Sequence, residues 1–92
     1  MSAIARRDVF QAISDPIRRE IIHLIAQQPM NLNAITERFN ISRPAISNHI
    51  KFLTECGLVT ITQQGRERIW QAKPDGLKEI ETWVQQYNQF WN

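Results

Sequence analysis

The sequence predicts a mostly α-helical protein with one small β-hairpin, in the order four helices, two strands and a fifth helix. Apolar residues recur at helical spacing in segments bounded by capping residues and prolines. One segment rich in β-branched residues precedes a glycine turn. The length of 92 residues fits a single domain, residues 1–92, without repeats or a flexible linker.

The first two helices are separated by a strong start signal. We expect the first helix over residues 3–12 and the second over Pro16–Gln27. Asp15 can cap the second helix, and a proline follows it at the first helical position, where a missing N–H is tolerated. Arg18 and Arg19 lie off the apolar stripe of this helix. The stripe follows the spacing of a buried face and consists of Ile17, Ile21, Leu24 and Ile25.

The third and fourth helices are expected to be short and close together in sequence. The third starts at residues 31–33 and closes at Asn40, which we expect in the left-handed conformation. Ser42 caps the fourth, which stops at Gly57 after Cys56. Only about three residues then join the two helices, the length typical of a helix-turn-helix. Their core-facing residues are Leu32, Ile35, Phe39, Ile46, Ile50 and Leu53.

The rest of the chain predicts a hairpin and a last helix. Leu58–Thr62 is the first strand, Gln64-Gly65 is the turn, and Arg68–Ala72 is the returning strand. Residues 74–76, Pro-Asp-Gly, break the chain again. Leu77–Trp91 is expected to form one continuous aromatic helix.

The outer face of the fourth helix is polar and mildly basic. A helix that reads DNA buries one face, enters a groove about 12 Å wide and carries polar or arginine side chains near its start. Arg43 can bond a guanine, Asn48 can pair with an adenine or a phosphate, and Ser47 can do either. Lys51, one turn further, suits a phosphate. An ordinary solvated helix face gives the same pattern, and helix-turn-helix geometry also occurs in proteins that bind no DNA.

The hairpin tip favours the DNA-binding interpretation. Its residues 63–68 read Gln-Gln-Gly-Arg-Glu-Arg. Such a tip can lie over the DNA backbone or place Arg66 in a narrow minor groove. A tip can also be polar simply because it is exposed. A helix-turn-helix followed by an arginine-bearing hairpin is nevertheless a more specific indication of DNA binding than either feature alone.

Charge and composition indicate which partners and which cellular compartment suit the protein. Residues 1–74 carry ten Lys/Arg against six Asp/Glu, whereas residues 75–92 carry one Lys against three Asp/Glu. The basic body favours phosphate-bearing partners. No apolar run is long enough for a membrane span, and the N-terminus lacks the apolar region of a signal peptide. Cys56, the only cysteine, suits a reducing compartment, so we expect a cytoplasmic protein without a membrane partner.

The last helix carries more aromatic residues than one small domain can bury against a single face. Trp83, Tyr87, Phe90 and Trp91 fall within nine residues. Packing inside the domain and a small-molecule pocket between two copies are alternative interpretations. We expect a homodimer interface, because an exposed aromatic patch on a monomer favours aggregation. The residues of the last helix expected in it are Ile80, Trp83, Val84, Tyr87, Phe90 and Trp91.

Three segments together resemble winged helix-turn-helix repressors of the ArsR/SmtB family. They are FQAISDPIRREIIHLI, ISRPAISNHIKFLTECGLV and QQGRERIWQAKP, within a match that spans roughly residues 7–91. The resemblance implies a homodimer that binds a pseudo-palindromic double-stranded DNA operator and represses its own operon. It also implies that the first helix, with Ile4 and Val9, joins the last in the dimer interface. The expected DNA-contacting residues are Ser42, Arg43, Pro44, Ser47, Asn48, Lys51, Gln64, Arg66 and Arg68.

The chain departs from the metal-sensing members of that family. The positions that carry thiolates in such members correspond to Asn31, Asn33 and Thr36, and no histidine follows His49. A transition-metal site needs about four converging ligands, which this chain does not offer in one segment. The sequence therefore resembles the metal-independent autorepressor branch, with no cofactor and an unknown effector. A metal-responsive repressor with an unrecognised site is the alternative.

The remaining reactive side chains have structural interpretations. His23 is expected at the surface, His49 beside the core where it bonds a neighbour, and Cys56 as a small filler at a helix end. No nucleophilic triad, phosphate loop or paired-carboxylate motif is present, so we expect no enzyme. The rival to a DNA-binding repressor is a winged-helix interaction module that dimerises or binds another protein.

Overall fold

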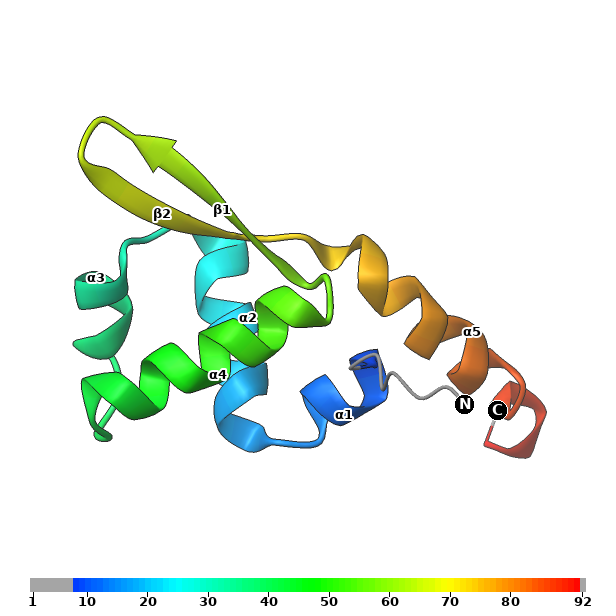
Figure 1. Ribbon diagram of the computed structural model, residues 1–92. Coiled ribbons are helices and arrows are strands. Elements are labelled where there is room, and N and C mark those ends of the chain that lie inside the picture. Colours follow the sequence, from blue (N-terminus) through cyan, green and yellow to red (C-terminus); the bar gives the residue numbers. More distant parts are fainter. Residues whose placement is uncertain (1–7, 92) are drawn as a thin grey trace, which may run out of the picture.

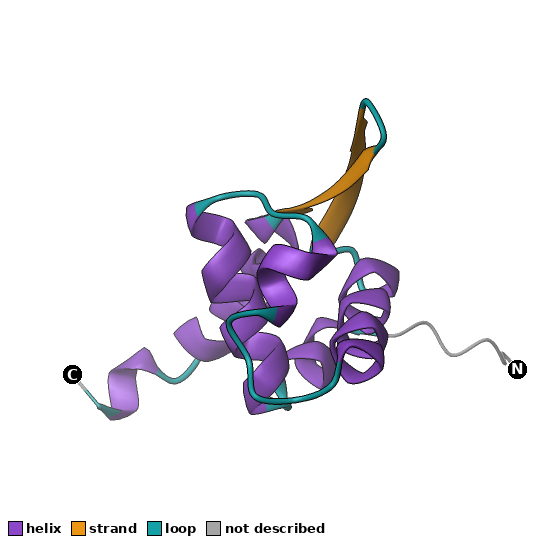
Figure 2. Cartoon of the chain, turned by 90° about the vertical axis from the view of Figure 1, so that its left-hand side faces the viewer, coloured by secondary structure: helices purple, strands orange, loops and turns teal. Residues whose placement is uncertain are grey.

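The computed structural model describes residues 8–91 and has five α-helices and one β-hairpin in the predicted order (Figure 1). The hairpin projects from the helical body, as Figure 2 shows. Two short 3₁₀ helices, η1 and η2, flank the last α-helix. The elements are α1 Val9–Ile13, α2 Pro16–Gln27, α3 Leu32–Thr36, α4 Arg43–Glu55, β1 Val59–Gln64, β2 Glu67–Ala72, η1 Pro74–Leu77, α5 Lys78–Gln85 and η2 Asn88–Phe90.

The hydrophobic core lies between the helices and the base of the hairpin. The core faces predicted for α2 and α4 are confirmed, because Ile21 and Ile25 of α2 and Ile46, Ile50 and Leu53 of α4 are all buried. The other buried hydrophobic residues of the described chain are Val9, Ala12, Ile35, Leu58 and Val59.

Capping residues define the bounds of α2. Asp15 Oδ1 accepts hydrogen bonds from the backbone N–H groups of Ile17 at 2.7 Å and Arg18 at 3.2 Å. Pro16 occupies the first turn, as expected. The predicted range of α2 is confirmed at both ends. Helix α1 is capped by Asp8 and begins at Val9, and the earlier part of its predicted range, with Ile4, lies outside the described residues.

Helix α3 ends differently from the prediction. Asn31 Oδ1 accepts a hydrogen bond from the N–H of Ala34 at 2.8 Å and so caps its start. No described residue other than glycine has a positive φ, so the left-handed conformation expected at Asn40 is wrong. The N–H groups of Arg38 and Phe39 instead bond carbonyls three residues back and complete the end of the helix. Because α3 stops at Thr36, its connection to α4 is longer than about three residues.

Helix α4 has the predicted start and stop. Ser42 Oγ accepts a hydrogen bond from the N–H of Ala45 at 3.2 Å, and Pro44 lies in the first turn. At the other end Gly57 takes a φ of 80°. Its N–H bonds the Thr54 carbonyl, and the N–H of Leu58 bonds the Leu53 carbonyl, both at 3.0 Å. This pair of bonds is a Schellman motif, which glycine permits because it has no Cβ.

The hairpin is antiparallel and its turn lies one residue later than predicted. Gln64 pairs with Glu67, so the connecting loop is Gly65-Arg66, with Gly65 at a φ of 62°. At its base, Met30 exchanges two backbone hydrogen bonds with Trp70, of 3.1 Å and 2.8 Å. This bridge attaches the hairpin to the connection between α2 and α3, a contact that the sequence did not predict.

The prediction of one continuous helix over Leu77–Trp91 is wrong. Helix α5 ends at Gln85, and η2 follows after a turn. The N–H of Tyr87 bonds the Val84 carbonyl at 2.9 Å, three residues back, which tightens the chain out of the α-helix. Beyond Val84 every described side chain is exposed. Most helical stability in proteins comes from packing, so this segment lacks the support that would extend the helix. No helix in residues 8–91 has the length and apolar character needed to cross a membrane.

Candidate nucleic-acid interface

The outward face of α4 is exposed along its whole first half. Arg43 and Pro44 occupy its first two positions, and Ser42 is the cap. These residues and Ser47, Asn48 and Lys51 are all exposed, while Ile46 and Ile50 between them are buried. The core contacts therefore fix the helix and leave its polar face open, which is the arrangement that a helix reading a groove requires.

The hairpin tip lies at the same end of the molecule as α3 and the start of α4, whereas α5 lies at the opposite end (Figure 1). Gln64, Arg66 and Arg68 are exposed there. A hollow of about 360 Å³ separates the tip from α3 and α4, and its lining includes Arg43, Arg66 and Arg68. The structure therefore brings together arginines from two elements that the sequence could only place in order along the chain.

A second groove, of about 280 Å³, runs between α4 and the hairpin. Ser47 and Lys51 line it from α4, and Ile61, Arg68 and Trp70 line it from the two strands. The Arg68 guanidinium carbon lies 5.8 Å from the centre of the Trp70 ring, within the range of a cation–π contact. Cationic side chains on both walls make this groove suitable for a negatively charged backbone.

Glu67 places one negative charge between the two arginines of the tip. Its Oε1 accepts a hydrogen bond of 3.3 Å from Nδ2 of Asn31, the residue that caps α3. The contact ties the hairpin tip to the start of the helix-turn-helix. The sequence showed Glu67 in the tip but gave no indication of its partner, which is 36 residues away.

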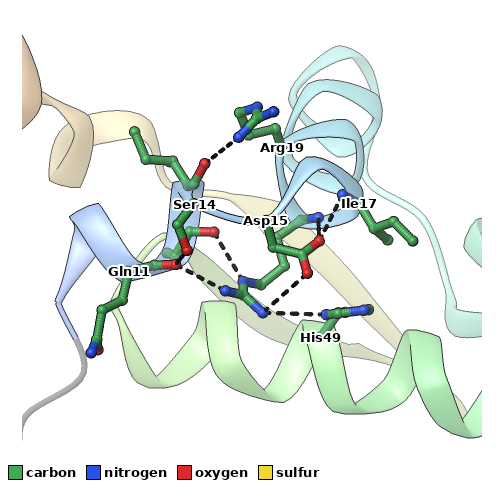
Figure 3. Close-up of polar contacts among 9 residues, drawn as sticks. Gln11, Ser14, Asp15, Ile17, Arg19 and His49 are labelled. Carbon is green, nitrogen blue, oxygen red and sulfur yellow. Dashed lines mark hydrogen bonds and ion pairs between the residues drawn. The ribbon is translucent and has the colours of Figure 1, made fainter.

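Arg18 is the functional candidate that helical periodicity missed. The sequence placed it only off the apolar stripe of α2, but its side chain is 13% exposed. Its guanidinium contacts the end of α1 and His49 of α4 (Figure 3). It also covers the ring of Phe52 of α4. His49 bonds this neighbour from beside the core, as predicted.

Asp15 completes the polar cluster around Arg18. Its Oδ2 lies 3.9 Å from Arg18 Nη1. Burial acts to raise the pKa of the Asp15 carboxyl, but hydrogen bonds from the backbone N–H groups of Arg18 and Ile17, together with electrostatic interactions with His49 and Arg18, bring the pKa below its ordinary value. The ionised carboxylate is therefore part of the folded cluster.

Two of the residues aligned with the thiolate positions of metal-sensing family members, Asn31 and Thr36, form hydrogen bonds within the fold. Asn31 caps α3 and bonds Glu67, and Thr36 Oγ1 donates to the Leu32 carbonyl at 2.8 Å. Within residues 8–91, no three His, Cys, Asp or Glu side chains come together in a way that can hold a metal ion. The His23 and Gln27 side chains lie 3.3 Å apart at the surface, and Cys56 Sγ lies 3.4 Å from the Asp8 carbonyl.

The aromatic residues of the C-terminal segment form a second exposed surface. The ring centres of Phe10 and Trp83 are 6.0 Å apart, those of Trp83 and Tyr87 are 5.1 Å apart, and those of Tyr87 and Phe90 are 6.1 Å apart. Trp83 is 50% exposed, Phe90 72% and Trp91 62%. Ile80 and Val84 are half-buried at the edge of this surface.

Val9 does not belong to that exposed surface. The sequence placed it in the dimer interface, but it is 6% exposed and lies in the core of its own chain. A Cβ placed on Gly76 would lie 3.6 Å from Val9 Cγ1, which shows how closely α1 packs against the start of the C-terminal segment. The fold of one chain therefore already buries Val9, and its place in a dimer interface stays a prediction.

Comparisons with known proteins agree with this geometry. Residues 15–60 match the family described as bacterial regulatory protein, arsR family. The transcriptional repressor SdpR of Bacillus subtilis is 34% identical over 77 residues, which cover 84% of this chain and 86% of that protein. The arsenical resistance operon repressor of Staphylococcus xylosus is 31% identical, over 78% of this chain and 69% of that protein.

Solved structures show the same fold. An ArsR-like transcriptional regulator from Rhodococcus sp. RHA1 superposes with a TM-score of 0.82 at 30% identity, over 90% of this chain and 76% of that chain. NolR from Sinorhizobium fredii, at 19% identity and a TM-score of 0.70, shares the fold over 86% of this chain and 79% of that chain.

Proposed function

The chain belongs to the arsR family of bacterial regulatory proteins, and from this we propose that it is a homodimeric repressor that binds a pseudo-palindromic operator, normally that of its own operon. The observation that carries the proposal is the pairing of the exposed polar face of α4 with the arginines of the hairpin tip at one end of the molecule. A winged-helix interaction module has no need for arginines from two elements around one hollow.

The residues of this surface divide into two roles. Arg43, Ser47 and Asn48 lie on the first two turns of α4, from which side chains reach base edges in the major groove, so they set sequence preference. Lys51, Arg66 and Arg68 border the groove between α4 and the hairpin or lie at its tip. They neutralise phosphates and set affinity and salt dependence. Ser42, Pro44 and Gln64 complete the surface that faces DNA.

The aromatic surface formed by Phe10 of α1 and the C-terminal segment supports the proposed homodimer. Its rings form an exposed apolar patch of the kind that marks an interaction site, and a second copy related by two-fold symmetry would cover them. Trp83, Tyr87, Phe90 and Trp91 are the main contacts, with Ile80 and Val84 at the edge. Each domain of residues 1–92 then acts as one DNA-binding unit, and the dimer holds its two α4 helices about one DNA turn, or a multiple of it, apart.

Repression in this proposal is steric, because a dimer seated across two half-sites blocks access to the promoter. The protein–DNA complex does not depend on a metal ion. Adding stoichiometric zinc, copper or trivalent arsenic should therefore leave the complex intact, and release of the DNA would support a metal-responsive repressor instead.

A mobility-shift titration on the DNA upstream of the chain's own gene tests the proposal. Arg43→Ala should weaken binding to that DNA by about 1–3 kcal/mol and relax sequence preference. Lys78→Gln is the matched control, because it removes one exposed cation from α5, away from the surface that faces DNA. Absence of binding at low salt, or equal binding by the Arg43 variant, would favour the interaction module.

A further inference from the structure

One side chain joins the end of α1 to the recognition helix. Arg18 Nε donates to the Ala12 carbonyl and Nη2 donates to the Gln11 carbonyl, both at 2.9 Å. Nη1 lies 3.5 Å from His49 Nδ1, and the guanidinium carbon lies 4.1 Å from the centre of the Phe52 ring. Figure 3 shows the residues of α1 and α4 that converge on this point from opposite sides.

The chemistry of this contact requires arginine. Two N–H groups of the guanidinium bond carbonyls at the end of α1. The Ala12 carbonyl is one of the last acceptors of the helix, and the Gln11 carbonyl also accepts from Ser14. The flat face of the same group covers an aromatic ring, and its remaining edge meets the imidazole. A lysine ammonium keeps the charge but cannot fill these three roles at once, because it lacks the planar fork.

The two helices that Arg18 connects carry different parts of the proposed function. Helix α1 supplies Phe10, whose ring meets Trp83 in the aromatic surface proposed to form the dimer. On α4, His49 directly follows Asn48, and Phe52 directly follows Lys51. A change in the direction of α4 relative to α1 would therefore alter the separation of the two recognition helices.

We propose that Arg18 is a positioning residue that fixes the direction of α4 relative to α1, and so sets the half-site spacing that the dimer accepts. This inference rests on the proposed function for the dimer and its operator. Arg18 does not contact DNA in this account. It acts through its contacts with His49 and Phe52 of α4.

The neighbouring arginine provides a matched control. Arg19 Nη1 also donates to a carbonyl of α1, that of Ile13, at 2.5 Å. It is exposed, and within residues 8–91 it has no hydrogen bond, ion pair or ring contact with α4. Arg18→Lys and Arg19→Lys therefore make the same chemical change at adjacent positions, and only the first alters the link to α4.

The first measurement requires neither DNA nor a dimer. Nitroxide labels on Asn48→Cys of α4 and Glu81→Cys of α5 report the distance between these two helices within one chain, when a Cys56→Ala protein is diluted with unlabelled protein. Helix α5 serves as the reference for α1, because Trp83 of α5 packs against Phe10 of α1. The distribution of distances between the two labels should be broader in Arg18→Lys than in the parent protein and unchanged in Arg19→Lys. Equal widths in all three would overturn the inference, whatever becomes of the proposed function. Arg18→Met removes the charge and all the hydrogen bonds of this side chain. If Arg18→Met does not fold, Arg18→Lys still provides the test.

The second measurement separates positioning from a general loss of stability. Affinities are measured for a single half-site and for paired half-sites at the best spacing and at one base pair more. Arg18→Lys should lower the preference for the best spacing by about three- to tenfold while the single half-site affinity stays close to that of the parent. An unchanged preference, or an equal loss in Arg19→Lys, would contradict the proposed role. Failure of the parent protein to bind any DNA would refute the proposed function instead and leave the label measurement as the test of Arg18.

Discussion

Replacing Arg66 of the hairpin tip with glutamine should weaken DNA binding and make the affinity depend less steeply on salt concentration. Arg66 is exposed at the turn between the two strands and borders the hollow that Arg43 and Arg68 also line. It is not held in an ion pair with a carboxylate within residues 8–91. Its charge is therefore available to a phosphate, and its removal should leave the fold intact.

The expected size of the salt effect follows from the number of cationic side chains on the surface that faces DNA. Lys51, Arg66 and Arg68 give three proposed phosphate contacts per chain and six per dimer. Each neutralised phosphate contributes about 0.9 to the slope of log K against log salt, so the parent dimer should have a slope of about −5. Arg66→Gln removes one contact per chain and should reduce the steepness by about 2. The loss of affinity should be nearly the same on cognate and unrelated DNA, because phosphates carry no sequence information.

Fluorescence anisotropy of labelled operator DNA at several salt concentrations measures this slope. Lys78→Gln serves as the control, since it removes the same charge from α5 without touching the proposed interface. An unchanged slope in Arg66→Gln, or an equal change in the control, would show that Arg66 does not neutralise a phosphate. A parent slope near zero would show that the basic surface does not meet phosphates at all.

Three further predictions concern other parts of the structure. Glu67→Gln should tighten DNA binding a few-fold, because it removes a negative charge between two arginines while its amide oxygen still accepts from Asn31; weaker binding in a mobility-shift titration would contradict this. Trp83→Ser should shift the dimer toward monomer in sedimentation equilibrium, because half of this ring is exposed within the proposed interface; an unchanged dimer would place the interface elsewhere. For Asp15, whose pKa is lowered by folding, the ionised form is the stabilising one, so its contribution is complete above the ordinary carboxyl value of 3.8 and is lost as the pH falls below it. The difference in free energy of unfolding between the parent and Asp15→Asn, measured by urea denaturation, should therefore shrink from pH 6 to pH 3, and a constant difference would exclude this role.

The sequence was sufficient where local chemistry decides the structure. Asp15, Ser42 and Gly57 mark helix ends through hydrogen bonds to nearby backbone groups, so the start of α2 and both ends of α4 could be predicted. Apolar periodicity identified the core faces of both helices for the same reason.

The sequence was insufficient where distant residues decide the structure. The end of α5 depends on the packing that surrounds it, which periodicity alone does not report. The bridge between Met30 and Trp70 and the contact between Asn31 and Glu67 join segments far apart in the chain. The role of Arg18 was not predicted, because apolar periodicity considers only apolar residues. It cannot identify a charged side chain that is mostly buried and satisfied by hydrogen bonds.

Selection of bound sequences from random DNA with the purified protein tests whether a dimer reads DNA through α4. The account predicts enrichment of an inverted repeat whose two half-sites lie about one helical turn, or a multiple of it, apart. It also predicts that Arg43→Ala selects a repeat with relaxed preference at one position of each half-site. Enrichment of no sequence, or of a single site without two-fold symmetry, would contradict a dimer that reads DNA through α4.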